Sequence, residues 1–282
     1  MPLNLLSGTR VLEFAGLACG PFCGKVLADL GADVIKVEPP GNGDEARRRG
    51  PFPSDDPDPE ASGLFLALNT NKRGITLDLT TASGRELFLA LVRSADVLIE
   101  DRAPRFWADL ELPVERLHEA NPELVVTSIT PFGGTGVHSD YRAHPINVEH
   151  AGGGGYLNPN GRISWESSPG RPPTKHGAYL MECEIGLNAA LGTMGAVCAR
   201  QLGAGGQHVD FSKQESQISS YRLPLDRYGD DGTVHGRLSV GFPSLGLMPA
   251  RDGWTMPLLL EQHMWESLAR LMGSPDWTRE PW

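Results

Sequence analysis

The chain has 282 residues, which is long enough for one large domain or two small ones. Hydrophobic residues make up 40% and charged residues 21%, so the chain can bury a core and is not disordered throughout. The 25 Lys and Arg residues against 35 Asp and Glu residues give a formal net charge of -10, which argues against nucleic-acid binding by overall charge.

The first part of the chain predicts a compact strand–helix–strand unit. Residues 10–14 (RVLEF) have the apolar character of a short strand, which a run of glycine and proline then interrupts. A helix over 22–30 follows, with Pro21 suited to its first turn and Gly31 to its C-terminal end. Residues 32–38 (ADVIKVE) are mostly β-branched or apolar and predict a buried parallel strand.

Residues 39–63 are rich in proline, glycine and charge and predict a long loop, a type of segment that often acts as a lid. Strands and helices then alternate, and we expect a helix over 64–68, a strand over 75–79, a helix from Thr80 or Thr81 to about 92, a strand over 96–100, a helix over 114–120 and a strand over 124–129. This alternation predicts an α/β fold with a mostly parallel, doubly wound sheet. Ligands of such sheets lie beyond the carboxyl ends of the strands, which here lead into 16–20, 101–102 and 130–136.

The second half of the chain is less regular. We expect a loop over 152–177, a long helix over 179–202 with small residues that permit close packing, a strand over 207–211 and an amphipathic helix over 261–272. We therefore expect a large α/β domain over 1–220 and a smaller α+β domain over 221–282.

The sequence shows no pattern typical of a membrane span, a signal peptide or a cysteine-bound metal. The apolar runs are five or six residues long against the roughly 20 that span a bilayer, and residues 1–4 do not resemble the start of a signal peptide. The four cysteines, Cys19, Cys23, Cys183 and Cys198, lack metal-ligand spacing and are interpreted as buried or helix-facing thiols. We therefore expect a cytoplasmic protein in a reducing compartment, without a metal site or membrane contact.

Three local features suggest chemistry, and each also has a purely structural interpretation. The glycine-rich run over 16–24 puts free N–H groups at a helix start, which favours an anion, but it matches no dinucleotide or phosphate-loop motif. Lys72 and Arg73 lie in a predicted turn and are either solvated or a phosphate clamp. An acid such as Glu182 is favoured near a helix start by the helix dipole, whatever its function. In the functional interpretation, Glu182 is a nucleophile or base, and His144 is its partner in proton transfer.

Four longer stretches identify a family. They cover residues 8–44, 69–101, 121–136 and 189–216, and LADLGADVIKVE within the first is a highly specific motif. Together they resemble the family III CoA-transferases, the carnitine dehydratase/bile-acid-inducible protein F group. That group also includes formyl-CoA transferases and α-methylacyl-CoA racemases. The resemblance extends over most of residues 8–216, in the family's order.

The resemblance implies a Rossmann-like domain over 1–220 that binds a CoA thioester as substrate, no tightly bound cofactor, and an interlocked homodimer. It also implies that a carboxylate attacks the acyl thioester, so that anhydride and enzyme–CoA thioester intermediates carry CoA to a carboxylic acid. The family's nucleophilic Asp falls on Glu182, which keeps the carboxylate but moves it by one methylene. The CoA-contacting turn falls on Leu17, Ala18 and Cys19, and the basic clamp on Lys72 and Arg73.

Three functions stay open at this point. The first is a CoA-transferase with Glu182 as nucleophile. The second is an α-methylacyl-CoA racemase or isomerase, because His144 falls on the racemase histidine and would act with Glu182 on opposite faces of the α-carbon. The third is a non-catalytic CoA-binding subunit or a truncated relative, since family members continue beyond the point where this chain stops and their Glu-Asn-aromatic segment is 100–102 (EDR) here. We expect the C-terminal part of the family fold to be missing, and a homodimer or another chain to cover the exposed surface.

Overall fold

The computed structural model describes residues 4–157, 172, 174–220, 222–236 and 248–279. The chain forms two compact units. The first consists of residues 1–152 and 176–220, and the second of residues 153–175 and 221–282. Within the described ranges, no helix has both the length and the apolar character that crossing a membrane requires.

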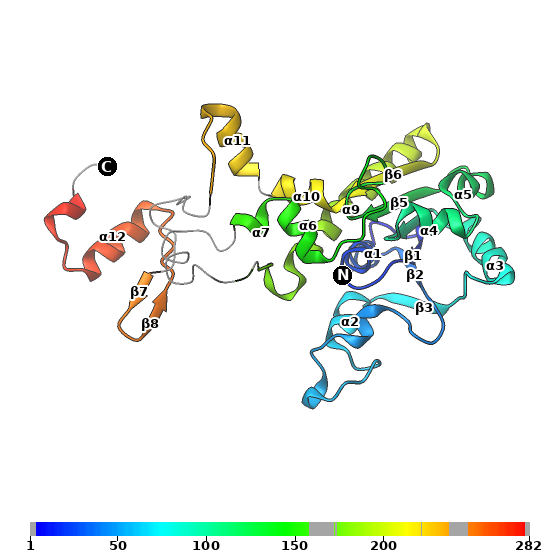
Figure 1. Ribbon diagram of the computed structural model, residues 1–282, viewed down its shortest axis with the longest axis horizontal. Helices are drawn as coiled ribbons and strands as arrows, with labels where there is room; N and C mark the ends of the chain where they lie inside the picture. Colours follow the sequence, from blue (N-terminus) through cyan, green and yellow to red (C-terminus); the bar gives the residue numbers. More distant parts are fainter. Residues whose placement is uncertain (1–3, 158–171, 173, 221, 237–247, 280–282) are drawn as a thin grey trace. The chain divides into compact units, whose positions relative to one another are not determined.

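The first unit is built on a six-stranded parallel sheet (Figure 1). Its strands are β1 (Arg10–Phe14), β2 (Asp33–Glu38), β3 (Lys72–Thr76), β4 (Val97–Glu100), β5 (Val125–Thr130) and β6 (Gln207–Ser212). They lie in the order β3-β2-β1-β4-β5-β6, so the direction of winding reverses between β1 and β4. Sheets of this order bind ligands at that reversal, beyond the carboxyl ends of the strands. The predicted Rossmann-like fold is confirmed.

Helices cover both faces of this sheet. Its unit contains α1 (Cys19–Asp29), α2 (Gly63–Leu68), α3 (Ala82–Val92), α4 (Pro104–Asp109), α5 (Val114–Ala120), α6 (Pro145–Ala151), α9 (Leu180–Ala199) and α10 (Lys213–Ser220). Val11 and Val97 pack against α1 and α9, whereas their neighbours Leu12 and Leu98 pack against α3, α4 and α5. Because consecutive strand residues point to opposite faces, continuous apolar strands are buried on both sides.

The second unit is small and contains both helices and strands. Its described residues include α7 (Gly154–Leu157), α11 (Arg222–Asp231), the antiparallel hairpin of β7 (Met248–Ala250) and β8 (Gly253–Thr255), and α12 (Gln262–Leu271). The amphipathic helix predicted over 261–272 is thus present as α12. Most of the loop predicted over 152–177 lies outside the described residues.

The structure differs from the local predictions in three places. β3 begins at Lys72, not at residue 75, because pairing with β2 sets its bounds. The register runs from Val34 opposite Lys72 to Glu38 opposite Thr76. The Asp78 carboxylate then accepts from the Thr80 N–H at 2.9 Å, which starts a turn where the prediction had a strand. α1 begins three residues before its predicted start, and α4 is missed because six residues are too few for a helical period to stand out.

α1 and α9 approach each other closely at Gly186. A β-carbon there would lie 2.5 Å from the carbonyl oxygen of Cys19 and 3.1 Å from Cβ of Phe22, so only glycine permits this contact. The other end of α9 lies at the amino edge of the sheet, where the Arg200 guanidinium is 3.0 Å from the Asp96 carboxylate. α9 therefore runs antiparallel to the strands, and its first turn lies at the carboxyl edge beside the start of α1.

We expect Gly186→Ala to lower the free energy of unfolding by about 1–3 kcal/mol, because the added methyl group would overlap the backbone of α1. Gly195→Ala is a matched control in the same helix, since a β-carbon there meets nothing within 4 Å. Alanine has the higher helix propensity, so this control should be neutral or stabilising by up to about 1 kcal/mol. Denaturant unfolding of both variants is the measurement, and equal changes would contradict this account of the helix contact.

Candidate functional site

The turn between β1 and α1 lies at the carboxyl edge of the sheet, where ligands of this fold bind. Leu17 has a left-handed backbone with φ of 61°, a conformation that residues other than glycine rarely adopt. Ala18 is the N-cap residue of α1, and Cys19 is the first residue of the helix. The three residues that the sequence assigns to CoA contact therefore form one tight turn into a helix start.

Two carboxylates from other parts of the chain hold this turn. The Gly16 N–H donates to Asp101 Oδ2 at 2.9 Å, and the Leu17 N–H donates to Asp44 Oδ1 at 2.8 Å. Asp101 follows β4, and Asp44 lies in the long loop after β2. Neither partner is visible in the glycine-rich run itself, because each contact depends on how the strands are ordered in the sheet.

Glu182 lies beside this turn. It is in the first turn of α9 and only 7% exposed. One helical turn further along, a β-carbon added at Gly186 would lie 2.5 Å from the carbonyl oxygen of Cys19, and the Glu182 charge raises the pKa of the Cys19 thiol. The structure therefore brings together Glu182 and Cys19, which are far apart in the sequence. A shielded carboxylate next to a helix start has the chemical character of a nucleophile or base.

The thiol of Cys19 is not a competing nucleophile. Burial raises its pKa to about 12; Lys213 acts in the opposite direction, whereas Asp101 and Glu182 raise the pKa further. Since the thiolate is the reactive form, this thiol is inert near neutral pH. Lys213, the first residue of α10, brings positive charge to this part of the sheet edge. Sequence reasoning missed it, although a lysine just after the predicted strand over 207–211 was a usable signal.

Lys72 and Arg73 are both paired with carboxylates of the protein. The Lys72 ammonium lies 2.7 Å from Glu13 Oε2 and donates to the Pro21 carbonyl at 2.7 Å, with only 2% of its side chain exposed. Burial lowers the pKa of Lys72, and Glu13 opposes this effect. Arg73 makes a bidentate ion pair with Asp33 and is 65% exposed. The phosphate-clamp role of these two cations stays a prediction.

His144 and Glu182 belong to different helices: His144 precedes α6, and Glu182 is in α9. It is exposed at the N-terminal end of α6, where its N–H donates to Asn147 Oδ1 at 2.9 Å. Across the described part of the chain, no hydrogen bond or ion pair joins His144 to Glu182. Their partnership in proton transfer stays a prediction.

A different histidine is paired with a buried carboxylate. His176 Nδ1 lies 2.5 Å from Glu149 Oε1, and the His176 N–H donates to the same oxygen at 3.0 Å. Glu149 is 2% exposed, and His176 immediately precedes the 3₁₀ turn Gly177–Tyr179 that leads into α9. The pair thus anchors the segment before Glu182 to α6. Sequence reasoning missed it, because no local signal connects the two residues.

The last residue of β4 and the segment that follows it add an acid, Glu100, and a cation, Arg102. Burial raises the pKa of Glu100 to about 7, although the Arg102 N–H, which donates to Glu100 Oε2 at 2.7 Å, and the side chains of Ser128 and Trp107 act in the opposite direction. The Arg102 guanidinium lies over the Phe14 ring, 5.5 Å from its centroid, and is partly exposed at the sheet edge. The edge therefore carries acids and cations close to the turn.

Comparisons with known proteins identify the family. The chain matches the family model of CoA-transferase family III over residues 6–282. It is 33% identical over 279 residues to the succinyl-CoA:mesaconate CoA-transferase of Haloarcula hispanica, covering 97% of this chain and 69% of that protein. It is 31% identical over 301 residues to the formyl-CoA:oxalate CoA-transferase of Escherichia coli O157:H7, covering 98% and 70%.

The solved structures agree with the sequence matches. A CaiB/BaiF family protein from Brucella suis has a TM-score of 0.80 and 30% identity, with 98% of this chain and 71% of that chain covered. A Mycobacterium tuberculosis protein has a TM-score of 0.79 at 27% identity, with 99% and 72% covered. The chain therefore belongs to CoA-transferase family III, and the resemblance seen in its sequence is confirmed.

The raised pKa of Glu100 predicts a pH dependence of stability. Because its native pKa of about 7 lies above the ordinary 4.5, the folded protein binds this proton more tightly than the unfolded chain. The free energy of unfolding should therefore fall as the pH rises through this window, by about 3 kcal/mol from this group. Glu100→Gln cannot ionise and should lose this part of the dependence. Denaturant unfolding near pH 5 and pH 7.5 is the measurement, and identical pH dependence in both proteins would contradict the assignment.

Proposed function

We propose that this protein transfers CoA from an acyl-CoA thioester to a carboxylic acid, with Glu182 as the nucleophile. The observation that carries the proposal is the position of the Glu182 carboxylate, shielded in the first turn of α9 beside the turn of Leu17, Ala18 and Cys19. Family membership supports it, as do relatives whose names describe transfer between succinyl-CoA and mesaconate or formyl-CoA and oxalate.

The chemistry divides into four acyl substitutions. A Glu182 oxygen attacks the acyl carbonyl, the carbon–sulfur bond breaks, and CoA leaves as a thiolate from a mixed anhydride. The CoA thiolate then attacks the Glu182 carbonyl carbon, which releases the first acid and forms a glutamyl–CoA thioester. The acceptor carboxylate attacks that thioester and expels CoA again, leaving a second anhydride. CoA finally attacks the acceptor carbonyl, so the new thioester departs and the Glu182 carboxylate is restored.

This sequence requires that CoA stay bound while it leaves and returns. The turn of residues 17–19 supports that role, because it places a helix start at the carboxyl edge next to Glu182. Holding the thiolate close to the anhydride makes its return an intramolecular event, which accelerates it over a bimolecular reaction. In this proposal residues 1–220 are the CoA-binding domain and the acids are small-molecule substrates.

We also infer that the protein acts in the cytoplasm as an assembly, either a homodimer or a complex with another chain. α9 supports the need for a partner, because several of its leucines are exposed along one helix. Leu180, Leu187 and Leu191 are 59%, 50% and 72% exposed. Their spacing of seven and four residues puts them on one face, and an apolar stripe of this kind is typical of a protein interface.

The covalent step predicts a labelled glutamate. Incubation with succinyl-CoA or formyl-CoA and then hydroxylamine should convert Glu182 to its hydroxamate, which peptide mass spectrometry detects. Glu182→Gln should abolish the label and lower the transfer rate by at least about 100-fold, because it removes the nucleophile. Glu184→Gln is the matched control on the same helix, since its carboxylate accepts from Ser220 at 2.6 Å and should leave labelling intact.

Other outcomes would favour the other functions. Exchange of the α-proton of a 2-methylacyl-CoA without any label on Glu182, and lost in His144→Ala, would contradict transfer and support a racemase. CoA binding without a label, transfer or exchange would indicate a binding subunit.

A further inference from the structure

Beneath the CoA-contacting turn lies a row of buried charges that joins three strands to the loop after β2. Lys36 is the central member, with 2% of its side chain exposed. Its ammonium lies 2.8 Å from Glu13 Oε1 and 2.8 Å from Asp44 Oδ2, and it donates to the Ala15 carbonyl at 2.9 Å. Glu13 in turn lies 2.7 Å from Lys72. The row therefore runs from Lys72 through Glu13 and Lys36 to Asp44, which forms its end on the loop.

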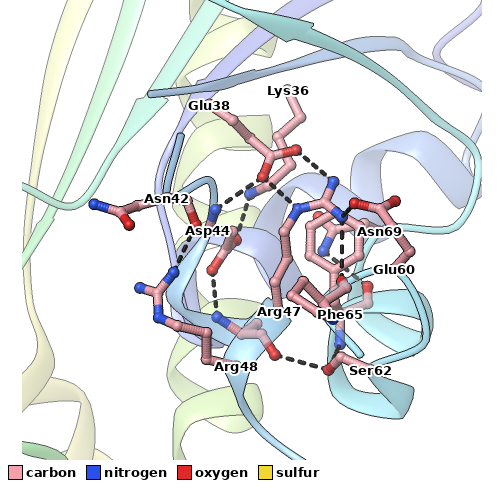
Figure 2. Close-up of polar contacts among 12 residues, drawn as sticks. Lys36, Glu38, Asn42, Asp44, Arg47, Arg48, Glu60, Ser62, Phe65 and Asn69 are labelled. Atoms are coloured by element: carbon pink, nitrogen blue, oxygen red, sulfur yellow. Dashed lines mark hydrogen bonds and ion pairs between the residues drawn. The ribbon is translucent and has the colours of Figure 1, made fainter. Parts of the chain in front are cut away.

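Asp44 connects this row to the turn. One oxygen lies against Lys36, and the other accepts from the Leu17 N–H at 2.8 Å and from the Ala46 N–H at 2.8 Å (Figure 2 shows the loop side of this arrangement). The pKa of Asp44 is lowered: burial alone would raise it, but Lys36 and the backbone donors outweigh burial. Both oxygens of the Asp44 carboxylate therefore bind groups of the protein itself.

The loop that carries Asp44 is itself held in place. The Asp44 N–H donates to Glu38 Oε2 at 2.8 Å, and Arg47 makes a bidentate pair with Glu38 at 2.8 and 2.9 Å. The Arg47 guanidinium lies over the Phe65 ring, 3.7 Å from its centroid, and Ser62 Oγ donates to the Ala46 carbonyl at 2.7 Å (Figure 2). Both ends of the loop are therefore tied to the residues around Asp44.

This arrangement addresses a conformational problem at Leu17. Its φ of 61° is a region that leucine avoids, because its Cβ is crowded there. A turn of this kind persists only where surrounding contacts favour it over the alternatives. The charge-assisted hydrogen bond that the Leu17 N–H donates to Asp44 is such a contact, and it acts on the backbone of the strained residue itself.

We propose that Asp44 is a positioning residue for CoA: held by Lys36 and by the Glu38–Arg47 pair, it keeps Leu17 in the left-handed conformation that shapes the CoA-contacting turn. This inference rests on the proposed function for the identity of the ligand. It assigns to the loop over 39–63 a role in preorganising the site. Asp44 itself touches no reacting atom.

The test compares two carboxylates of the same chemistry at opposite edges of the sheet. Asp44→Asn keeps the shape but removes the charge. Asp96→Asn is the matched control, because Asp96 also accepts a backbone N–H, from Arg10 at 2.8 Å, and also pairs with a cation, Arg200 at 3.0 Å. CoA binding is measured by calorimetry, and thermal unfolding is recorded for each protein. We expect Asp44→Asn to raise the Kd for CoA by about 10- to 100-fold and Asp96→Asn to leave it within about twofold.

A second variant separates positioning from general destabilisation. Glycine adopts a positive φ without crowding, so adding Leu17→Gly to Asp44→Asn should recover most of the lost CoA affinity, although it restores no charge. A merely structural role of Asp44 predicts no such recovery. If Asp44→Asn does not fold, Glu38→Gln loosens the same loop from outside the row and should raise the Kd for CoA by a smaller factor.

The outcomes distinguish this inference from the proposed function. Unchanged CoA affinity in Asp44→Asn, equal weakening in Asp96→Asn, or no recovery with Leu17→Gly would overturn the positioning role and leave transfer through Glu182 intact. Loss of affinity in Asp44→Asn, with no label on Glu182 in the unmodified protein, would overturn the transfer mechanism and leave positioning intact. Absence of CoA binding by the unmodified protein would overturn both.

Discussion

A fully buried lysine is the constraint on which the carboxyl edge of this protein depends. Removing an ammonium group from water is costly unless anions replace the water, and Lys36 has Glu13 and Asp44 on either side of it. The pKa of Lys36 is raised, because these two carboxylates outweigh the effect of burial. Both must reach the same nitrogen, so β1, β2 and the following loop have to meet at one point. The turn after β1 is built on that point.

The candidate site is formed by two close approaches at this edge. Asp44 and Asp101 hold the backbone of the β1–α1 turn, and Gly186 lets the first turn of α9 rest on the same helix start. Together they put a shielded carboxylate, Glu182, beside the turn that leads into α1. A thioester bound between the two would present its carbonyl to an acid from which water is largely excluded. That is the arrangement that covalent transfer through a carboxylate requires.

Sequence reasoning succeeded where a local pattern reports directly on burial. The mostly apolar runs over 10–14, 96–100 and 124–129 predict buried strands, and their alternation with helices predicts the parallel sheet. It was less successful where tertiary pairing decides. β3 is displaced from its apolar run because its partner β2 sets the register, and the ion pair between Lys72 and Glu13 joins two strands that lie far apart in the sequence. No pattern within one segment contains that information.

By itself, the sequence determined the fold class, the family and the identity of the candidate acid, because apolar period and motif spacing are properties of neighbouring residues. Only the tertiary structure decided which groups act together: Asp44 with Leu17, Glu149 with His176, and Glu182 with the start of α1. Those contacts join residues far apart in the chain, and they form because strand order and the close packing of α1 on α9 bring the ends of separate elements to one edge. Hydrogen bonds and ion pairs act over a few ångströms, so they cannot be assigned until that packing is known.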